Sequence, residues 1–272
     1  MRTRLLTSLT NVEVEEYLKR NVVIFVPVGT VEVHGALPLD CEYVAPLAYC
    51  MKMDEKVDGL VLPHMIYFYP GATQVGRGTV HTSCIEGAEF LLTIARSLLR
   101  QGFKTQIYIT GHGPAYGYME PFLFDFFHET QVPILYMNQM SINQLVEGVN
   151  TSKVMYGAYS IVGRLDDIPL SFEGIDLPDD YTPQGAPTAA SKLRNLNNTQ
   201  ATQWYYNSPY DHGGIPKSIT AGEREQWAKE GTEAIQKIVD GMGIEEIVKN
   251  LKEHQKYIEM QVEKYGDLLD FK

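Results

Sequence analysis

Residues 21–42 read NVVIFVPVGTVEVHGALPLDCE, an apolar half followed by a polar half. The apolar half, residues 21–29, is a nearly continuous run rich in β-branched residues that ends at Gly29. Such a short run bounded by turn residues is typical of a strand buried on both faces, as in a parallel sheet. Pro27 has no N–H to donate, so we expect the strand to end or bulge there. The segment predicts one buried strand that leads directly into polar, potentially functional side chains.

Three further apolar runs are expected to be strands, and five segments have helical patterns. The runs are residues 59–68, 104–110 and 132–138; the helical segments are 11–19, 84–102, 121–130, 221–242 and 243–265. In residues 84–102 the apolar positions recur at helical spacing, and Gly102 stands where a C-terminal cap belongs. Strands that alternate with helices predict an α/β fold with a mainly parallel sheet, here as a single domain over residues 1–272.

Residues 166–217 differ from the rest of the chain. They are rich in Pro, Gly, Asn and Asp, and they carry the aromatic residues Trp204, Tyr205, Tyr206 and Tyr210. Long irregular segments in compact domains are usually lids, binding loops or subunit contacts. The alternative is a surface excursion packed by its own aromatic side chains, and the sequence leaves both interpretations open.

The overall composition narrows the class of protein. The 272 residues carry a formal net charge of −11, which argues against nucleic acid or an anionic membrane as a partner and suits an enzyme with a small substrate. Cys41, Cys50 and Cys84 lack CxxC spacing and predict reduced thiols rather than disulfides. We see no secretory signal and no run of the roughly 20 apolar residues that a membrane helix needs, so we expect a cytoplasmic protein.

The polar half of the opening segment contains candidate metal ligands. Glu32 and His34 stand two residues apart beyond the first strand, and in extended backbone this spacing places both side chains on the same side. A carboxylate and an imidazole side by side are suitable ligands for Zn²⁺ or Mn²⁺. Taken singly, each residue is more often a loop residue or a helix cap than a ligand.

More candidate ligands follow along the chain. A turn at Gly35 and Pro38 would bring Asp40 and Glu42 into range as oxygen ligands, and His112 follows the 104–110 strand inside a Gly-His-Gly turn. Ligands of open α/β sheets collect beyond the carboxyl ends of strands, where these segments deliver their side chains. The sequence therefore predicts a metal site at this edge of the sheet.

The remaining histidines have weaker settings. His81 follows a turn and could reach the site, and His212 lies in the aromatic-rich region, where it could contact substrate. We interpret His254 as a surface residue and His128 as a structural one.

A serine hydrolase is not supported, because the chain has no Gly-x-Ser-x-Gly elbow. A dinucleotide-binding loop is not supported either, because the spacing of the glycines in GHGPAYG is wrong.

Three stretches resemble the creatininase (creatinine amidohydrolase) family. They are residues 9–49, with Glu-x-His-Gly followed by Leu-Pro; residues 77–113, which end in the Gly-His-Gly turn; and residues 213–239. The aromatic-rich segment does not match. The resemblance implies a three-layer α/β/α fold, one or two divalent metals (Zn²⁺ or Mn²⁺) per subunit and a homo-oligomer, often a hexamer.

The resemblance also implies roles for individual residues. Glu32, His34 and His112 fall on the family's metal positions. The family's aspartate falls on Glu42 when one residue is deleted before Leu-Pro, and on Asp40 when the gap lies elsewhere.

The chain departs from the family in several places. Tyr156 stands where the family has a substrate-side histidine, and Pro114 stands where true creatininases have a glutamate. A second metal would then be weak, absent or held by another group such as Glu120 or Glu173. Thr110 and the Arg77-Gly78-Thr79 segment also differ, which puts creatinine itself in doubt as the substrate.

These observations together predict a metal-dependent hydrolase. A metal-activated water would attack a carbonyl of a small substrate that we expect to be cyclic, with opening of a cyclic amide as the expected reaction. One alternative is hydrolysis of a cyclic ketone such as a dehydro-inositol, and another is a non-catalytic relative that binds metal or ligand. Tyr156, His81 and His212 are the candidates for the catalytic acid.

Overall fold

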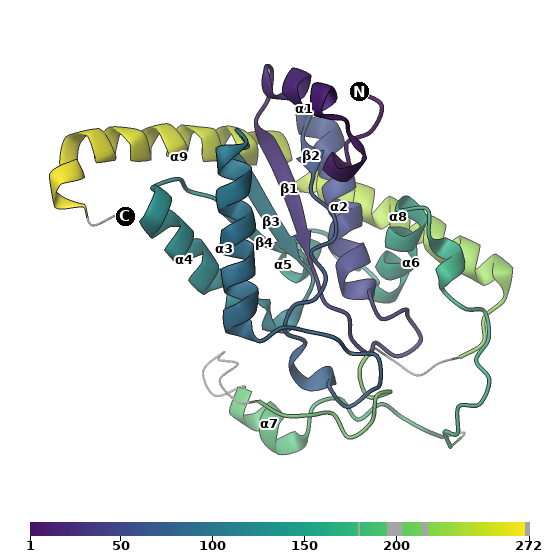
Figure 1. Cartoon of the computed structure of the whole chain (residues 1–272). Helices are drawn as coiled ribbons and strands as arrows, with labels where there is room; N and C mark the ends of the chain where they lie inside the picture. The colour runs from purple at the N-terminus through teal and green to yellow at the C-terminus, as the bar shows by residue number, and fades with distance from the viewer. Residues whose placement is uncertain (179, 195–202, 214–216, 270–272) are drawn as a thin grey trace.

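The computed structural model describes residues 1–178, 180–194, 203–213 and 217–269. Within these residues, four parallel strands form one sheet in the order β2-β1-β3-β4 (Figure 1). The strands are β1 (Val23–Val28), β2 (Leu60–Val61), β3 (Thr105–Thr110) and β4 (Leu135–Asn138). The expected α/β class with a parallel sheet is confirmed.

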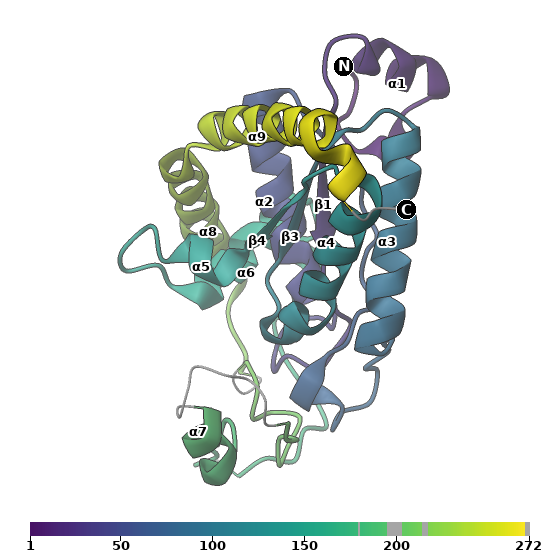
Figure 2. The same cartoon turned by 90° about the vertical axis from the view of Figure 1, so that its left-hand side faces the viewer.

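Alternate residues of β1 face two separate hydrophobic cores. Val23 and Phe25 pack in one core with α2 (Cys41–Val57), α6 (Thr151–Ile161), α8 (Ala221–Met242) and α9 (Ile244–Tyr265). Ile24 and Val26 pack in the other with α1 (Asn11–Leu18), α3 (Cys84–Arg100) and α4 (Tyr116–Thr130). The helices thus cover both faces of the sheet (Figure 2), which confirms the three-layer α/β/α architecture.

Shorter helices complete the described chain. They are η1 (Leu6–Ser8), η2 (Gly71–Thr73), η3 (Gly113–Ala115), α5 (Gln139–Asn143), η4 (Leu165–Asp167), α7 (Thr188–Arg194) and η5 (Gly266–Leu268). The expected irregular segment 166–217 contains α7, and its residues 179, 195–202 and 214–216 lie outside the described residues.

The five expected helices correspond to α1, α3, α4, α8 and α9. Three of them begin at a capping box, in which Thr10, Ser83 or Thr220 pairs with a glutamate three residues later. Gly243, with a φ of 66°, separates α8 from α9. The helices α2 and α6 were not expected. Pro46 lies inside α2, and an internal proline usually argues against a helix.

Two expectations about strands are wrong. Residues 59–68 contribute only the two-residue strand β2 and an isolated bridge of Met65 to Val28, because Pro63 lies two residues beyond β2 and His64 adopts a φ of 76°. Pro27 neither ends nor bulges β1, since it pairs in register with Ile109 of β3. The backbone of Phe25 bonds to Leu62 on the β2 side, and Pro27 faces that same side beyond the end of β2. The missing N–H of Pro27 thus falls between the end of β2 and the isolated bridge of Val28 to Met65, and pairing of β1 with β3 is continuous through Pro27.

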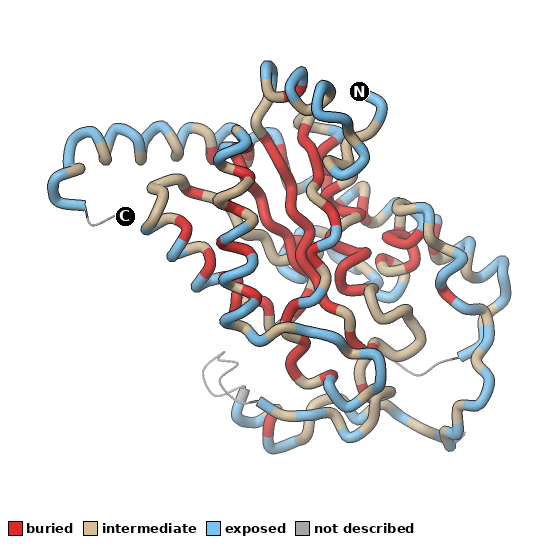
Figure 3. The backbone as a smooth tube through the Cα atoms, in the orientation of Figure 1, coloured by how far each residue is buried: buried red, intermediate tan, exposed pale blue. Residues whose placement is uncertain are grey.

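The loops at the carboxyl ends of the strands gather at the lower edge of Figure 1, on the side where α7 lies. At the opposite edge α9 crosses the sheet, and its second half is largely exposed (Figure 3). Cys41, Cys50 and Cys84 are all free thiols. None of the described helices combines the length and the apolarity needed to cross a membrane.

Candidate metal centre

Side chains from separate parts of the chain meet beyond the carboxyl ends of β1 and β3. Glu32 and His34 follow β1, Glu42 lies in the first turn of α2, and His112 follows β3. All four line a cavity of about 490 Å³, together with His212. The predicted convergence of the loops after β1 and β3 is therefore present in the fold.

One group of possible ligands is fully buried. Nδ1 of His112 contacts Oε2 of Glu42 and lies 3.6 Å from Oε1 of Glu32. Ligand atoms of these three residues all lie within 4.8 Å of one another, which is close enough to hold one ion. Thr73 was not singled out in the sequence, but its Oγ1 donates a 2.6 Å hydrogen bond to Oε2 of Glu32. This bond fixes the orientation of the Glu32 carboxylate.

A second group shares Glu42 with the first. Nε2 of His34 lies 3.4 Å from Oε1 of Glu42, and Nε2 of His212 lies 3.8 Å from the same oxygen. The two imidazole rings are 4.4 Å apart between centroids. Ligand atoms of these three residues also lie within 4.8 Å of one another. The Glu42 carboxylate thus stands between two possible ion positions.

Burial and close charges shift the pKa values of this cluster in different directions. Burial, with the nearby Glu42 charge, raises the pKa of Glu32 to about 8. Burial alone would raise the pKa of Glu42, but its contacts with His112 hold that pKa well below its usual range. Burial opposes the charged form of His112, yet the carboxylates of Glu42 and Glu32 outweigh it and raise the pKa. For His34, Cys41 and Glu42 outweigh burial and raise the pKa.

The donor set fits a divalent cation. Oε1 of Glu32 and Nε2 of His212 are buried, face the cluster and lack a hydrogen-bond partner in the described structure. Buried polar atoms are rarely left unpaired, and such exceptions often mark a site for an ion or a bound molecule. Carboxylate and imidazole groups are the ligands that Zn²⁺ and Mn²⁺ accept.

The geometry distinguishes between the two acidic candidates near the start of α2. The Asp40 carboxylate accepts a 2.7 Å hydrogen bond from Tyr159 and a 2.6 Å hydrogen bond from Arg164. The Asp40 carboxylate is therefore engaged by Tyr159 and Arg164 outside the cluster, whereas Glu42 points into the cluster. Glu120 and Glu173, which were suggested for a second metal, are both exposed and belong to neither described group of possible ligands.

The three candidate catalytic residues lie in different surroundings. The Tyr156 ring packs edge-on against Trp227, 5.2 Å away, in the core between the helices. The His81 ring is exposed and lies 6.1 Å from that of Tyr69. Neither Tyr156 nor His81 is among the described residues that line the cavity, whereas His212 is.

The cavity wall carries aromatic and carboxamide side chains beside the carboxylate–histidine cluster. Its aromatic members include Tyr116, Trp204 and Tyr206. Oε1 of Gln139 is buried in the wall without a described hydrogen-bond partner, so it is a ready acceptor for an N–H or O–H group. Among the described lining residues there is no lysine or arginine that would neutralise an anionic substrate.

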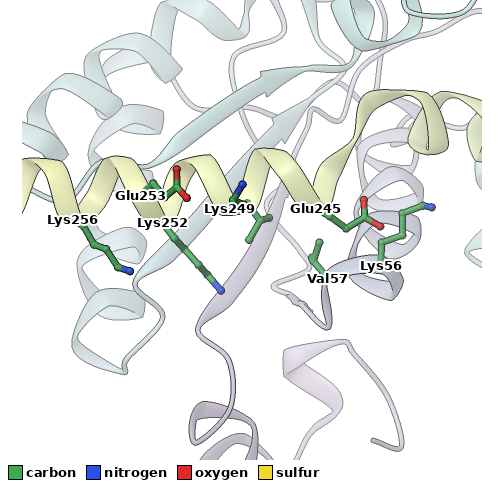
Figure 4. Close-up of a pocket in the computed structure, with 8 residues that line it drawn as sticks. Lys56, Val57, Glu245, Lys249, Lys252, Glu253 and Lys256 are labelled. Atoms are coloured by element: carbon green, nitrogen blue, oxygen red, sulfur yellow. The ribbon is translucent and has the colours of Figure 1, made fainter.

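A second hollow, of about 430 Å³, lies between the end of α2 and α9 (Figure 4). Lys56 and Val57 come from α2, while α9 supplies alternating charges such as Glu245, Lys249 and Lys252. Lys56 is paired with Asp240 at 2.7 Å. The described lining contains no histidine or cysteine, so the cluster beyond β1 and β3 stays the candidate site.

The chain combines a three-layer α/β/α fold with a carboxylate–histidine cluster beyond its parallel strands, and comparison with known proteins gives its family. The family model for creatinine amidohydrolase matches residues 7–155, more than half of the chain. The protein belongs to the creatininase family, whose members are hydrolases. The expected family membership is confirmed.

A curated relative is the creatinine amidohydrolase of Pseudomonas putida, 30% identical over 96 residues. That match spans 33% of this chain and only 37% of the relative. A crystal structure of creatinine amidohydrolase is similar with a TM-score of 0.58 at 16% identity, covering 94% of this chain and 99% of that one. A creatininase variant complexed with creatine gives a TM-score of 0.60 at 18% identity, covering 92% and 99%. Other similar creatininases are described as manganese and zinc–zinc forms.

Proposed function

We propose that the protein is a metal-dependent hydrolase that opens a small cyclic amide. The observation that carries the proposal is the cluster of Glu32, His34, Glu42 and His112, in which Oε1 of Glu32 has no hydrogen-bond partner among the described residues. A divalent ion held by these residues would lower the pKa of water to about 7 and polarise a substrate carbonyl. Water would add to the carbonyl carbon, the C–N bond would break, and the products would be a carboxylate and an amine.

The chain's own groups would bind and orient the substrate. Oε1 of Gln139 would accept a hydrogen bond from the N–H of a lactam ring, because this buried acceptor has no described partner. The rings of Trp204 and Tyr206 line the same cavity, where they provide flat surfaces for a planar ring and displace water from it. With no lysine or arginine among the described lining, we expect a substrate that is neutral or cationic.

A hydroxylated cyclic ketone, such as a dehydro-inositol, is the second candidate substrate. Carboxamides of Asn138, Gln139, Asn143 and Gln203 line the cavity. Such groups hydrogen-bond to hydroxyls as well as to amides. Attack of water on the ketone would then be followed by cleavage of a carbon–carbon bond.

The proposal is tested by metal analysis of the purified protein together with a hydrolysis screen. The screen spans creatinine, small lactams, formamides and keto-inositols. We expect bound Zn²⁺ or Mn²⁺, turnover of at least one lactam, and loss of turnover and of at least one metal equivalent in His112→Ala. His254→Ala, in an exposed histidine of α9, is the matched control and keeps both metal and turnover. A protein that takes up no divalent metal, or a His112→Ala variant that keeps all of the wild-type metal, would overturn the proposal.

A further inference from the structure

The aromatic-rich segment, outside the residues matched by the family model, supplies a side chain to the metal cluster. The match ends at residue 155, whereas His212 lies in the described stretch 203–213. Nε2 of His212 is buried without a described hydrogen-bond partner, 3.7 Å from Oε1 of Glu32 and 3.8 Å from Oε1 of Glu42. An imidazole nitrogen that has no described hydrogen-bond partner and lies this close to two carboxylate oxygens is placed as a ligand for a cation.

We propose that His212 is a metal ligand and that it completes, with His34 and Glu42, a second ion site beside the one formed by Glu32, Glu42 and His112. The inference rests on the proposed metal dependence and adds to it the number of ions and the origin of the last ligand. Pro114, which has no ligating atom in its side chain, lines the same cavity. His212 reaches the cluster from a distant part of the chain and supplies a donor there.

Tyr206 holds the His212 ring in a ligating orientation. Its ring stacks on the imidazole at a centroid distance of 5.2 Å and an interplanar angle of 26°. Its hydroxyl lies 3.2 Å from Nδ1 of His212. When Nδ1 carries the proton and donates it to the Tyr206 oxygen, the lone pair of Nε2 is free to face the ion. Tyr206 is therefore a positioning residue for His212.

Hydrogen bonds to Asp211 hold the turn that carries His212 in place. The buried carboxylate of Asp211 accepts hydrogen bonds from the Tyr181 hydroxyl at 2.7 Å, from the Gln184 N–H at 2.8 Å and from the Ser208 N–H at 3.0 Å. These bonds tie residues 208–211 to a second stretch of the same segment. A carboxylate with three such partners holds the backbone next to His212 in one place.

Gly213 fixes the same backbone against the other histidine of the group. Its φ is 79°, and a Cβ atom at this position would lie 2.3 Å from Nδ1 of His34. Only glycine fits both the conformation and the contact. The His212–Gly213 backbone therefore packs directly on the His34 ring, which brings the two imidazoles to one side of Glu42.

The experiment is a titration of the metal-free full chain with Zn²⁺, read by elemental analysis, and with Co²⁺, read by its visible absorption. In the wild type we expect two bound equivalents. In His212→Ala we expect one of the two to be lost, and in Tyr206→Phe we expect the weaker equivalent to bind about 10–100-fold less tightly. The matched controls are His254→Ala and Tyr205→Phe, since both side chains are exposed. Circular dichroism melts check that each variant is folded.

Each result decides the question. Two equivalents with unchanged affinity in both His212→Ala and Tyr206→Phe overturn the inference, as does a wild type that binds a single ion unaffected by these changes. In both cases, loss of bound metal in His112→Ala would still support the proposed metal-dependent hydrolase. A wild type that binds no ion at all overturns both proposals. Tyr206→Phe keeps the test valid if His212→Ala does not fold.

Discussion

Oγ1 of Thr73 donates a 2.6 Å hydrogen bond to Oε2 of Glu32, while Oε1 of the same carboxylate faces the cluster without a described partner. Oε2 thus orients the carboxylate, and Oε1 is left to contact a cation. Thr73 comes from η2, in the long connection between β2 and α3. A loop far from β1 in the sequence therefore orients Glu32, a candidate ligand in the loop that follows β1.

Replacement of Thr73 by valine should weaken metal binding without unfolding the protein. The change removes the hydrogen bond that orients Glu32. Loss of a residue that hydrogen-bonds to a metal ligand typically lowers metal affinity by about 10–100-fold. Zn²⁺ titration of the metal-free chain measures the effect. Thr93→Val, whose hydroxyl bonds only within its own helix, is the control. Equal affinities in Thr73→Val and wild type would show that the bond does not orient a ligand.

Metal uptake near pH 7 should release protons. In the metal-free protein, burial raises the pKa of Glu32 to about 8, and the groups close to His34 and His112 outweigh burial and raise their pKa values, so the protonated forms of these groups are favoured. A ligand atom must lose its proton before it binds an ion, so the apparent metal affinity should rise as pH increases towards about 8. Calorimetric titrations in buffers of different ionisation enthalpy count the protons. Binding heats that do not depend on the buffer would contradict this expectation.

The contact between α6 and α8 should tolerate no added methyl group at its centre. A Cβ atom on Gly231 would lie 1.8 Å from the carbonyl oxygen of Lys153, and one on Gly157 would lie 2.2 Å from the backbone of Gly231. Both obstacles are backbone atoms, so Gly231→Ala should lower the free energy of unfolding by at least about 1–3 kcal/mol.

Gly222→Ala is a matched control for that change within the same helix. No atom lies within 4 Å of a Cβ atom there, so alanine should be neutral or stabilise by up to about 1 kcal/mol. Urea denaturation of both variants gives the comparison. Similar stabilities for the two variants would mean that α6 and α8 can move apart to fit the methyl group without lowering the free energy of unfolding.

Asp54 should make the stability of the protein fall as pH rises. The side chain is buried in α2, and burial raises its pKa to about 8, an effect that Arg4 at 3.7 Å only partly offsets. Between the unfolded value of 3.8 and about 8, the folded state retains a proton that the unfolded chain gives up. By linkage, the free energy of unfolding decreases across this range.

Asp54→Asn keeps the site uncharged at every pH and should remove that contribution. We expect the melting temperature of the variant to exceed that of the wild type at pH 8, with a smaller difference, or a reversed one, near pH 4. Thermal denaturation at both pH values measures this. A constant difference between variant and wild type would show that Asp54 does not titrate in this range.

The sheet and much of the cluster were predictable because local patterns determine them. Glu32, His34 and His112 follow short apolar runs bounded by turn residues, the pattern typical of buried strands, and parallel strands bring their carboxyl ends to one edge. The helix α2 was missed because Pro46 interrupts its pattern. The choice between Asp40 and Glu42 depended on which of them faces the cluster, and the Tyr159 and Arg164 contacts that decide it come from α6 and beyond.

The place of His212 could not be read from any periodicity. It depends on Gly213 fitting against the His34 ring and on Asp211 joining two stretches of an irregular segment. Such contacts between residues distant in the sequence leave no local signal. The Gly213–His34 contact would be visible only as a paired change in related sequences.

The aromatic-rich segment places Trp204 and Tyr206 in the cavity wall and His212 in the metal cluster within ten residues. A mutation that reshapes the wall to admit a different molecule therefore also moves the support of a metal-facing imidazole. If the cavity binds substrate and His212 binds an ion, as proposed, then substrate preference and ion occupancy both depend on this one segment.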